Sequence, residues 1–245
     1  MIAHFTKHAA PLAALALGVG LSGCNVSVNW DDVDGVAFSE FDQSGDAPDA
    51  ISMSGVDEVI ITDGESFSMT LEGDEDAQDA LRFDRSGDEL RIGRDSGIYS
   101  GNGKAIIQIT MPPPSALSTS GTSSIQSEVM ASDAEIDTSG TSSITVTKLE
   151  SDNLDLDMSG ASEVTAAGSV ERLIIDLSGS TSASLRELLA DDVKADLSGA
   201  SSVTLSSNGI VEADLSGASK VTVIGSAKCS GDTSGASSLD CGPAD

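Results

Sequence analysis

The chain of 245 residues carries 40 acidic and only 12 basic side chains, which gives a formal net charge of −28. Such an excess of negative charge repels nucleic acid and anionic lipid headgroups, and it excludes a nucleic-acid-binding function. Aromatic residues make up 3% of the chain, with one Trp (Trp30) and one Tyr (Tyr99), so a platform for stacking sugars or bases is hard to build.

Residues 1–23 have the pattern of a bacterial lipoprotein signal peptide. Lys7 precedes an apolar run that is too short and too rich in Gly and Ala for a stable membrane span. The run ends at Leu21-Ser22-Gly23-Cys24, which resembles a lipobox and implies that Cys24 becomes the lipidated first residue. Asn25 follows it, and by resemblance to bacterial sorting rules this favours the outer membrane. The alternative is an ordinary signal peptide with a chance cysteine.

Removal of the signal peptide changes the composition of the mature chain. Both histidines, His4 and His8, lie inside it, and so does one Lys but no acidic residue. The mature chain therefore has 11 basic and 40 acidic side chains, a net charge of −29. Residues 24–50 are polar and acidic, and we expect them to form a tether that lifts the domain off the membrane. The alternative is a first, irregular coil of the domain that follows.

Residues 51–114 predict an N-terminal β region. The expected strands are Glu58–Thr62, Ser66–Leu71, Leu81–Asp84, Glu89–Gly93 and Ala105–Met111. Turn dipeptides separate them, and the run Pro112-Pro113-Pro114 ends the region. Because a solenoid needs its first coil covered, we assign this region the role of a cap.

Residues 115–245 are built from a repeat. A Ser-Gly pair recurs at steps of 18 to 20 residues, and the phrase around it is nearly constant, as in DLSGASSV and DLSGASKV. A fixed period near 20 residues is typical of a solenoid, in which each repeat forms one coil stacked on the last. The glycines of these pairs, which we expect at the corners of the coils, are Gly121, Gly140, Gly160, Gly179, Gly199, Gly217 and Gly235.

The residues around each of these glycines alternate between apolar and polar. Ala195 and Leu197 before Gly199, and Val203 and Leu205 after it, are separated by polar residues. This alternation indicates strands with one buried face, and Gly suits the corner between them because it tolerates backbone angles that other residues avoid. Each coil therefore consists of two short strands and a return segment of variable sequence. The sequence predicts an all-β, parallel β-helix-like solenoid with coils of about 19 residues.

The order of these segments resembles a known family. VDEVIIT, SFSMTLEGDEDAQDALRFDRSGDELRI and AIIQITMP, followed by SGTSSI and serial SGAS turns, are similar to the head-GIN domain family, also called autotransporter adhesins. The resemblance covers about residues 51–240. It implies a right-handed β-helix-like solenoid and a role in adhesion, and it supplies no catalytic residues.

A row of aspartates lies three residues before the corner glycines. Alternation places these side chains outside, in register and one coil spacing apart, so the like charges should raise some pKa values or recruit cations. The row predicts a weak calcium ladder; the alternative is that each Asp bonds backbone N–H groups at the corner and keeps the surface soluble. Its members are Asp137, Asp157, Asp176, Asp196, Asp214 and Asp232.

A second row lies two residues after the corner glycines. These side chains should turn inward and satisfy backbone groups at the bend. A serine nucleophile is excluded, because the mature chain has no His to act as its base and no strand–turn–helix elbow. The row consists of Ser123, Ser142, Ser162, Thr181, Ser201, Ser219 and Ser237.

The last coil contains two cysteines. Cys229 lies six residues before Gly235 and Cys241 six after it, which are the offsets of two inward positions in the coil around Gly199. They should therefore face each other across the interior and form a disulfide in the oxidising compartment that the export signal implies. The alternative is two buried free thiols.

Two functions from different classes fit these features. The first is a non-catalytic cell-envelope lipoprotein, an adhesin or scaffolding module that is anchored in the membrane and binds a cell-surface glycan or protein through a polar solenoid face. It needs no cofactor other than the calcium considered above. The second is a polysaccharide lyase or hydrolase on a β-helix. Short turns, scarce aromatics and the lack of His favour the first, and strand pairing should scatter the one Arg cluster, Arg82, Arg85, Arg91 and Arg94, over two faces.

Overall fold

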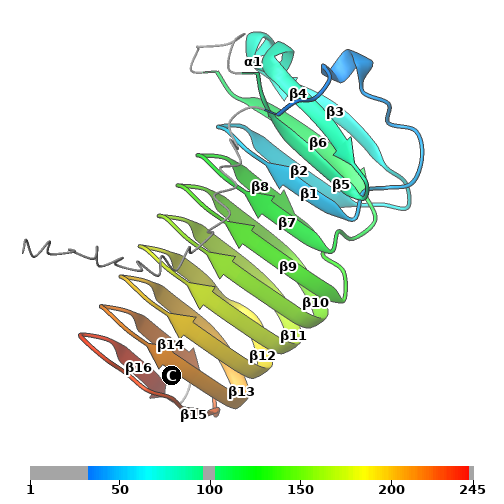
Figure 1. Ribbon diagram of the computed structural model, residues 1–245. Helices are drawn as coiled ribbons and strands as arrows, with labels where there is room; N and C mark the ends of the chain where they lie inside the picture. The colour runs from blue at the N-terminus through cyan, green and yellow to red at the C-terminus, as the bar shows by residue number, and fades with distance from the viewer. Residues whose placement is uncertain (1–32, 96–102, 243–245) are drawn as a thin grey trace, which may run out of the picture.

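The computed structural model describes residues 33–95 and 103–242. Its strands form one 16-stranded sheet that is wound into an elongated solenoid (Figure 1). The described helices are α1 (Glu75–Ala80) and the 3-10 turn η1 (Phe38–Glu40). The prediction of an all-β solenoid is therefore confirmed.

The strands of the repeat region pair in parallel, each coil with the next. Four long strands run through most of a coil: β10 (Ser143–Met158), β11 (Glu163–Leu177), β12 (Ser182–Leu197) and β13 (Ser202–Leu215). The shorter strands are β7 (Ala116–Thr119), β8 (Ser124–Ser127), β9 (Asp133–Thr138), β14 (Lys220–Ile224), β15 (Lys228–Ser230) and β16 (Ser238–Gly242).

Each coil has three segments. In β10 the alternation of buried and outward side chains breaks at Thr147-Lys148 and again at Asp152-Asn153, where two neighbouring residues both point away from the core. The chain bends at each break, so one long strand supplies the segment after a corner glycine, a short return segment and the segment before the next glycine. This agrees with the predicted two strands and a return segment.

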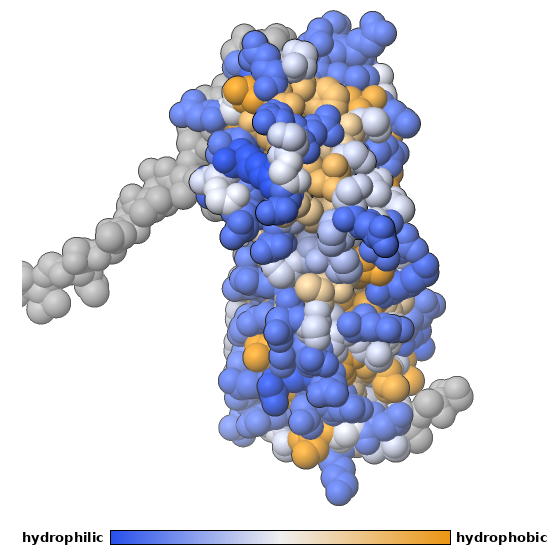
Figure 2. Space-filling view, turned by 90° about the vertical axis from the view of Figure 1, so that its right-hand side faces the viewer, coloured by the Kyte–Doolittle hydropathy of each residue, from blue (hydrophilic) through white to orange (hydrophobic). Residues whose placement is uncertain are grey.

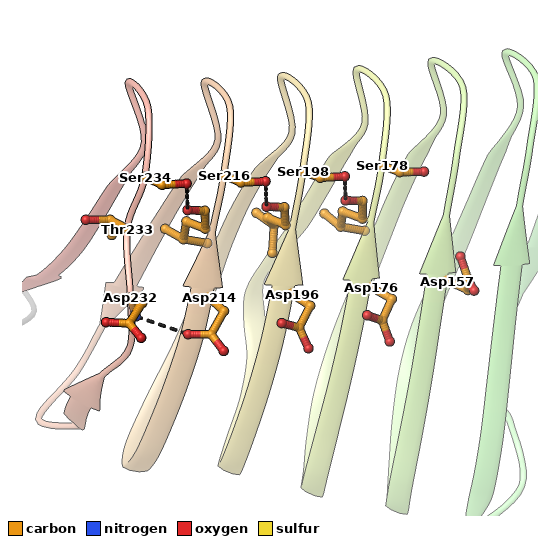
Figure 3. Close-up of a pocket in the computed structure, with 13 residues that line it drawn as sticks. Asp157, Asp176, Ser178, Asp196, Ser198, Asp214, Ser216, Asp232, Thr233 and Ser234 are labelled. Carbon is orange, nitrogen blue, oxygen red and sulfur yellow. Dashed lines mark hydrogen bonds between the residues drawn. The ribbon is translucent and has the colours of Figure 1, made fainter.

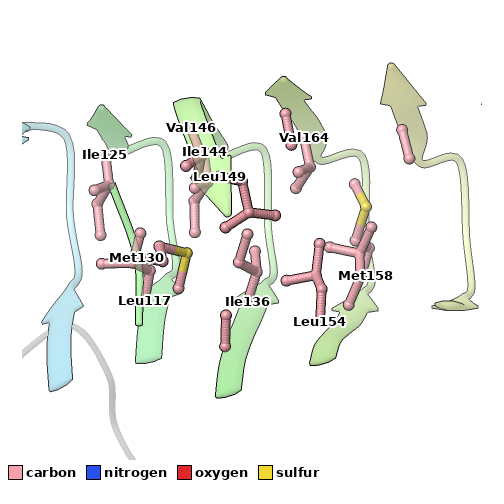
Figure 4. Close-up of a cluster of buried hydrophobic side chains, with 14 of the residues drawn as sticks. Leu117, Ile125, Met130, Ile136, Ile144, Val146, Leu149, Leu154, Met158 and Val164 are labelled. Atoms are coloured by element: carbon pink, nitrogen blue, oxygen red, sulfur yellow. The ribbon is translucent and has the colours of Figure 1, made fainter. Parts of the chain in front are cut away.

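Inward side chains stack along the axis of the solenoid. Leu117, Ile136 and Leu156 follow one another in register, and Ile125 and Ile144 do so on the opposite wall. Figure 4 shows Leu117, Ile136, Ile125 and Ile144 in the space between the walls, and these four residues and Leu156 are at most 1% exposed. Because burying such a side chain contributes about 1.5–3 kcal/mol, the stacked rows are the main source of stability.

The first coil of the solenoid precedes the repeat region. Strands β1 (Ala50–Met53) and β2 (Glu58–Asp63) pair in parallel with β7 and β8. Gly55 lies between them with a positive φ of 106°, in the position of a corner glycine. The solenoid thus begins at Ala50, inside the region that the sequence assigned to the cap.

The remaining N-terminal strands cover this first coil. They are β3 (Ser68–Gly73), β4 (Leu81–Ser86), β5 (Glu89–Arg94) and β6 (Ala105–Met111). Strands β5 and β6 pair in parallel with β1 and β2, and β4 and β3 then pair with them in antiparallel fashion. Every strand expected between residues 58 and 111 is present, and together they close the end of the core.

Residues 33–50, the described part of the expected tether, pack on the cap. Val36 and Phe83 exchange backbone hydrogen bonds of 3.0 and 2.9 Å. The rings of Phe38 and Phe41 lie 5.5 and 5.6 Å from the ring of Phe83. Residues 1–32, and with them the signal peptide and Cys24, lie outside the described residues. Within the two described ranges, no helix has the length and hydrophobicity that a membrane crossing requires.

Candidate binding surfaces

The corner glycines are fixed by two requirements. All seven predicted positions have positive φ, from 74° at Gly140 to 84° at Gly179. They also stack on one another: a Cβ atom added at Gly199 would lie 2.4 Å from the carbonyl oxygen of Gly179 in the coil before. A larger residue would therefore be strained in its own backbone and would also push the neighbouring coil away.

The inward hydroxyls that follow the corner glycines all form hydrogen bonds within the fold. Ser142 Oγ donates to the carbonyl of Ser139 at 2.7 Å, and Thr181 Oγ1 donates to Ser201 Oγ at 3.1 Å. This confirms the predicted hydroxyl row, which satisfies backbone carbonyls at the bend. The serines that repeat the Ser142 bond are Ser123, Ser162, Ser201, Ser219 and Ser237.

Asp57 takes the place of these hydroxyls in the first coil. It lies two residues after Gly55 and is fully buried. Its carboxylate accepts hydrogen bonds from Arg94 Nε at 2.6 Å and from the Ala105 backbone N–H at 2.8 Å. This buried ion pair was not predicted from the sequence, although the phrase SMSGVDEV matches DMSGASEV and places Asp57 where the repeat has Ser162.

The other arginines of the cap are also bound within the protein. Arg82 pairs with Asp95 at 3.5 Å, Arg91 pairs with Glu89 at 2.8 Å, and Arg85 donates to the carbonyl of Asp46. The expectation that strand pairing scatters this cluster is confirmed, and the described structure does not gather it into an anion site.

The predicted aspartate row lies on the outside of the segment before each corner. Asp176, for example, stands in register between Asp157 and Asp196 (Figure 3). We call the outward residues of this segment, from β9 to β15, the acidic face. A second outward row on this face includes Glu135, Asp155 and Glu212. Lys194 is the one basic residue in the two rows. An open groove of about 550 Å³ follows the aspartates of the last coils and the serines beside the corners.

Two carboxyl groups of this face have raised pKa values. Partial burial, followed by the charges of Glu135 and Asp157, raises the pKa of Asp137. Burial also raises the pKa of Asp176, with further increases from Asp196 and Asp157. The expected effect of like charges is therefore present at these two positions, although desolvation is the larger cause.

The calcium prediction receives no support from the geometry. Within the described residues, no three acidic, His or Cys side chains lie close enough together to hold a metal ion. Neighbouring aspartates come from different coils and stand side by side along the axis, so they do not converge on a point. Of the predicted bonds to backbone N–H groups, the structure has one: the Asp232 N–H donates to Asp214 Oδ1 at 3.0 Å.

The segment after each corner presents a different surface. Its outward residues five positions after the glycines form a row in register, which we call the hydroxyl face. From β8 to β14 the row consists of Gln126, Thr145, Thr165, Ser184, Thr204 and Thr222; Asp240, five positions after Gly235, follows Thr222 in β16 and is not counted in the hydroxyl face. Hydrophilic residues predominate on the side of the solenoid that Figure 2 displays, with hydrophobic ones in smaller patches. The hydroxyl face was not predicted from the sequence, although the fixed offset of its residues from the corner glycines could have located it.

The predicted disulfide is present at the far end. Cys229 and Cys241 are bonded, with their Cα atoms 6.3 Å apart. In register they follow Val211 and Val223, which are buried, so both cysteines continue inward-facing rows as expected. The disulfide spans the interior of the last coil, which no further strand covers among residues 33–95 and 103–242.

The comparisons with known proteins agree with this architecture. The family described as "Putative auto-transporter adhesin, head GIN domain" matches residues 47–227, well over half of the chain. The chain belongs to this family. The match begins three residues before β1, in agreement with a head-GIN domain that includes the first coil and the cap. No curated protein matches the chain.

Solved structures share the fold of this head-GIN chain at low identity. A "putative adhesin" from Bacteroides fragilis NCTC 9343 has a TM-score of 0.70 and 16% identity, covering 79% of this chain and 91% of its own. One from Parabacteroides distasonis ATCC 8503 has a TM-score of 0.67 and 13% identity, with 81% and 94% covered. A "putative lipid binding protein" from the same strain has a TM-score of 0.58 and 19% identity, with 80% and 92% covered. At such identities the likeness establishes the fold alone.

Proposed function

We propose that this head-GIN protein is a non-catalytic binding module of the bacterial cell envelope, anchored by a lipid on Cys24. The observation that carries the proposal is the repetition of outward rows, in which successive coils present the same chemical group at one coil spacing. A surface of this kind offers one weak contact many times along its axis. It suits an extended partner better than a small substrate.

Several features of the described residues argue against a polysaccharide-cleaving enzyme. They include no histidine, and the buried corner hydroxyls are hydrogen-bonded within the fold. The arginines of the cap have acidic or carbonyl partners. The groove beside the aspartates is open and follows the axis of the solenoid, whereas glycosidases enclose the sugar between two carboxyl groups. These features favour binding over catalysis.

The lipid anchor rests on the lipobox-like residues Leu21 to Cys24, and the family description as an adhesin supports a place at the cell surface. Asn25 after the cysteine favours the outer membrane. Cys24→Ser should move the protein from the membrane fraction to a soluble fraction. Unchanged membrane association of this variant contradicts the anchor.

Protease shaving of intact cells tests the surface role. We expect loss of the full-length protein from intact cells at protease levels that spare a periplasmic control. Complete protection contradicts a surface-exposed module. Fluorescently labelled Cys24→Ser protein should also bind saturably to cells that lack their own copy, without releasing reducing or unsaturated ends from a polysaccharide panel. Release of such ends overturns the non-catalytic proposal in favour of the enzyme.

A further inference from the structure

From Thr145 to Thr222, the hydroxyl face consists of side chains whose hydroxyls the fold does not use, whereas Gln126 at its beginning donates to Glu58. Thr145, Thr165, Ser184, Thr204 and Thr222 make no hydrogen bond through their side-chain hydroxyls with any described residue. The inward hydroxyls at the corners of the same coils, by contrast, are bonded to backbone carbonyls. The outer row is therefore available to a partner from outside.

These hydroxyls are also held in fixed positions. Thr145, Thr165, Thr204 and Thr222 are half-buried between their neighbours in adjacent coils. A β-branched side chain in a strand has few rotamers, so little side-chain freedom remains to be lost on binding. With coils stacked about 4.8 Å apart, the row from Gln126 to Thr222 extends over about 24 Å.

The charge of the face selects the kind of partner. From Gln126 to Thr222 the row contains no ionisable residue, and Asp240 follows it only in the last coil, whereas the acidic face of the same coils carries six aspartates. In the neighbouring outward row, two residues before the hydroxyl face in each coil, Glu163 and Lys220 contribute one charge of each sign among serines. With a net charge of −28, the chain repels polyanions, and this face has no basic cluster to overcome the repulsion.

The same face excludes a hydrophobic partner. The large hydrophobic residues that are well exposed in the described structure are Val36, Val56, Leu189 and Ile210, and none lies in the hydroxyl row. What remains is a neutral partner with many hydrogen-bond donors and acceptors, because a hydroxyl can act as both.

We propose that the hydroxyl face binds a neutral polysaccharide laid along the axis of the solenoid, with sugar hydroxyls bonded to successive threonines. This rests on the proposed function as a binding module and names its partner class. Each hydrogen bond replaces one with water and contributes little alone, and no aromatic ring lies in the row to add stacking. Affinity must therefore accumulate over many coils, so long chains bind and short oligosaccharides do not compete.

Affinity electrophoresis of the Cys24→Ser protein tests the proposal. The gels contain dextran or glucomannan as neutral polymers and alginate as an anionic polymer of similar length. We expect retardation by at least one neutral polymer and none by alginate. The double variant Thr165→Val/Thr204→Val keeps the β-branched shape and removes two hydroxyls, and it should weaken binding about tenfold.

Two further variants keep the test decisive. Thr165→Ser/Thr204→Ser retains both hydroxyls and should bind within about threefold of the unsubstituted protein, even if stability falls slightly. Asp176→Asn/Asp196→Asn alters the acidic face and should leave retardation unchanged. An equal melting temperature for the Val variant shows that loss of binding is not loss of fold; if the Val variant unfolds, single Ser184→Ala takes its place.

Each other outcome contradicts the inference. Retardation that the Val variant keeps, or that the Asn variant loses, places the binding elsewhere. If labelled protein binds cells but no neutral polymer retards it, this inference fails while the proposed function stands. If it binds neither, both fail.

Discussion

The two ends of the solenoid close the same core by different chemistry. At the N-terminal end, β3 to β6 cover the first coil, and the buried carboxylate of Asp57 bonds Arg94 and the backbone of Ala105 beneath them. At the C-terminal end, no strand follows β16 among the described residues, and the Cys229–Cys241 disulfide crosses the last coil. One end thus depends on secondary structure and an ion pair, and the other on a covalent bond.

The difference shows what a stack of coils needs at its boundaries. An interior coil is covered on both sides and needs only its apolar rows and its corner glycine. A terminal coil has one uncovered side, where open strand edges and exposed apolar groups invite pairing with other chains. The N-terminal end has more than forty residues of additional chain for this purpose and the C-terminal end has a crosslink, so the two ends should respond to different perturbations.

The largest effect should come from breaking the N-terminal closure. Asp57→Ala leaves the guanidinium of Arg94, whose side chain is 12% exposed, without its carboxylate partner. Removing one member of a buried ion pair costs about 3–5 kcal/mol, and here the backbone N–H of Ala105 also loses its acceptor. Urea denaturation should report this loss in the free energy of unfolding.

The matched control is Glu89→Ala, which removes the partner of Arg91 from an ion pair whose side chains are 48% and 30% exposed. A pair of this kind contributes about 0–1 kcal/mol. Equal losses for Asp57→Ala and Glu89→Ala are incompatible with a special role for the buried pair at this end.

The C-terminal closure should be sensitive to reductant instead. The disulfide closes a loop with a sequence separation of 12 residues, which corresponds to about 3 kcal/mol in the chain-entropy model. Reduction should therefore raise hydrogen exchange in β14 to β16 first and leave β1 to β6 protected. The variant Cys229→Ser/Cys241→Ser should exchange at the same rate with and without reductant. Uniform exchange along the whole solenoid argues that the two ends are not independent.

The C-terminal end could be predicted from sequence and the N-terminal end only in part. Cys229 and Cys241 keep the offsets of the repeat around Gly235, so alternation alone placed them face to face. Gly55 is separated from Gly121 by the whole cap, and no period of about 20 residues connects the two. The first coil was therefore missed, although the strands that cover it were predicted from local turn and strand signals.

The faces between the ends illustrate a second limit of sequence. The length of the repeat and the alternation of apolar and polar residues predict which side chains point outward, and so they located the row that contains Asp176. They do not state which hydroxyls find partners inside the fold or whether carboxylates converge. The bonded state of Ser142 and the free hydroxyl of Thr165 follow from the geometry of the corner and of the flat segment, and the failure of the aspartates to converge follows from their spacing along the axis.

The acidic face, which lies between the two ends, should have a smaller effect on stability. Because this face and the buried ion pair both contain carboxylates, a pH experiment must distinguish their contributions. Partial burial and the neighbouring carboxylates raise the pKa of Asp176 above its ordinary value in the folded state, so ionisation of this group disfavours folding. Stability should accordingly rise as pH falls through the folded pKa, and Asp176→Asn should be the more stable protein at higher pH. Solvent screens this largely exposed group, so we expect a gain below about 0.5 kcal/mol.

Melting temperatures from pH 3 to 8 measure the difference. It should be present at neutral pH, shrink as the pH falls through the folded pKa, and be smallest at pH 3, below the unfolded-state pKa of about 3.9, where the carboxyl group is mostly protonated in both states. Glu187→Gln, which removes one exposed charge from the return segment of β12, serves as the control. A gain of the same size in the control assigns the effect to net charge and not to the aspartate row.

The smallest effect on stability should come from calcium. Its addition tests whether the coils of the acidic face are linked to one another, as the last coil is by the disulfide. Ca²⁺ is bound by six to eight oxygens, and the described residues bring no three acidic groups together at one point. Any divalent cation still screens the repulsion between neighbouring aspartates, which slightly stabilises the stack. Calcium and magnesium at equal ionic strength should therefore raise the melting temperature by the same small amount. A saturable increase with calcium alone, lost in Asp176→Asn/Asp196→Asn, would mean that the row rearranges to bind the ion and holds the coils together as the disulfide does at the C-terminal end.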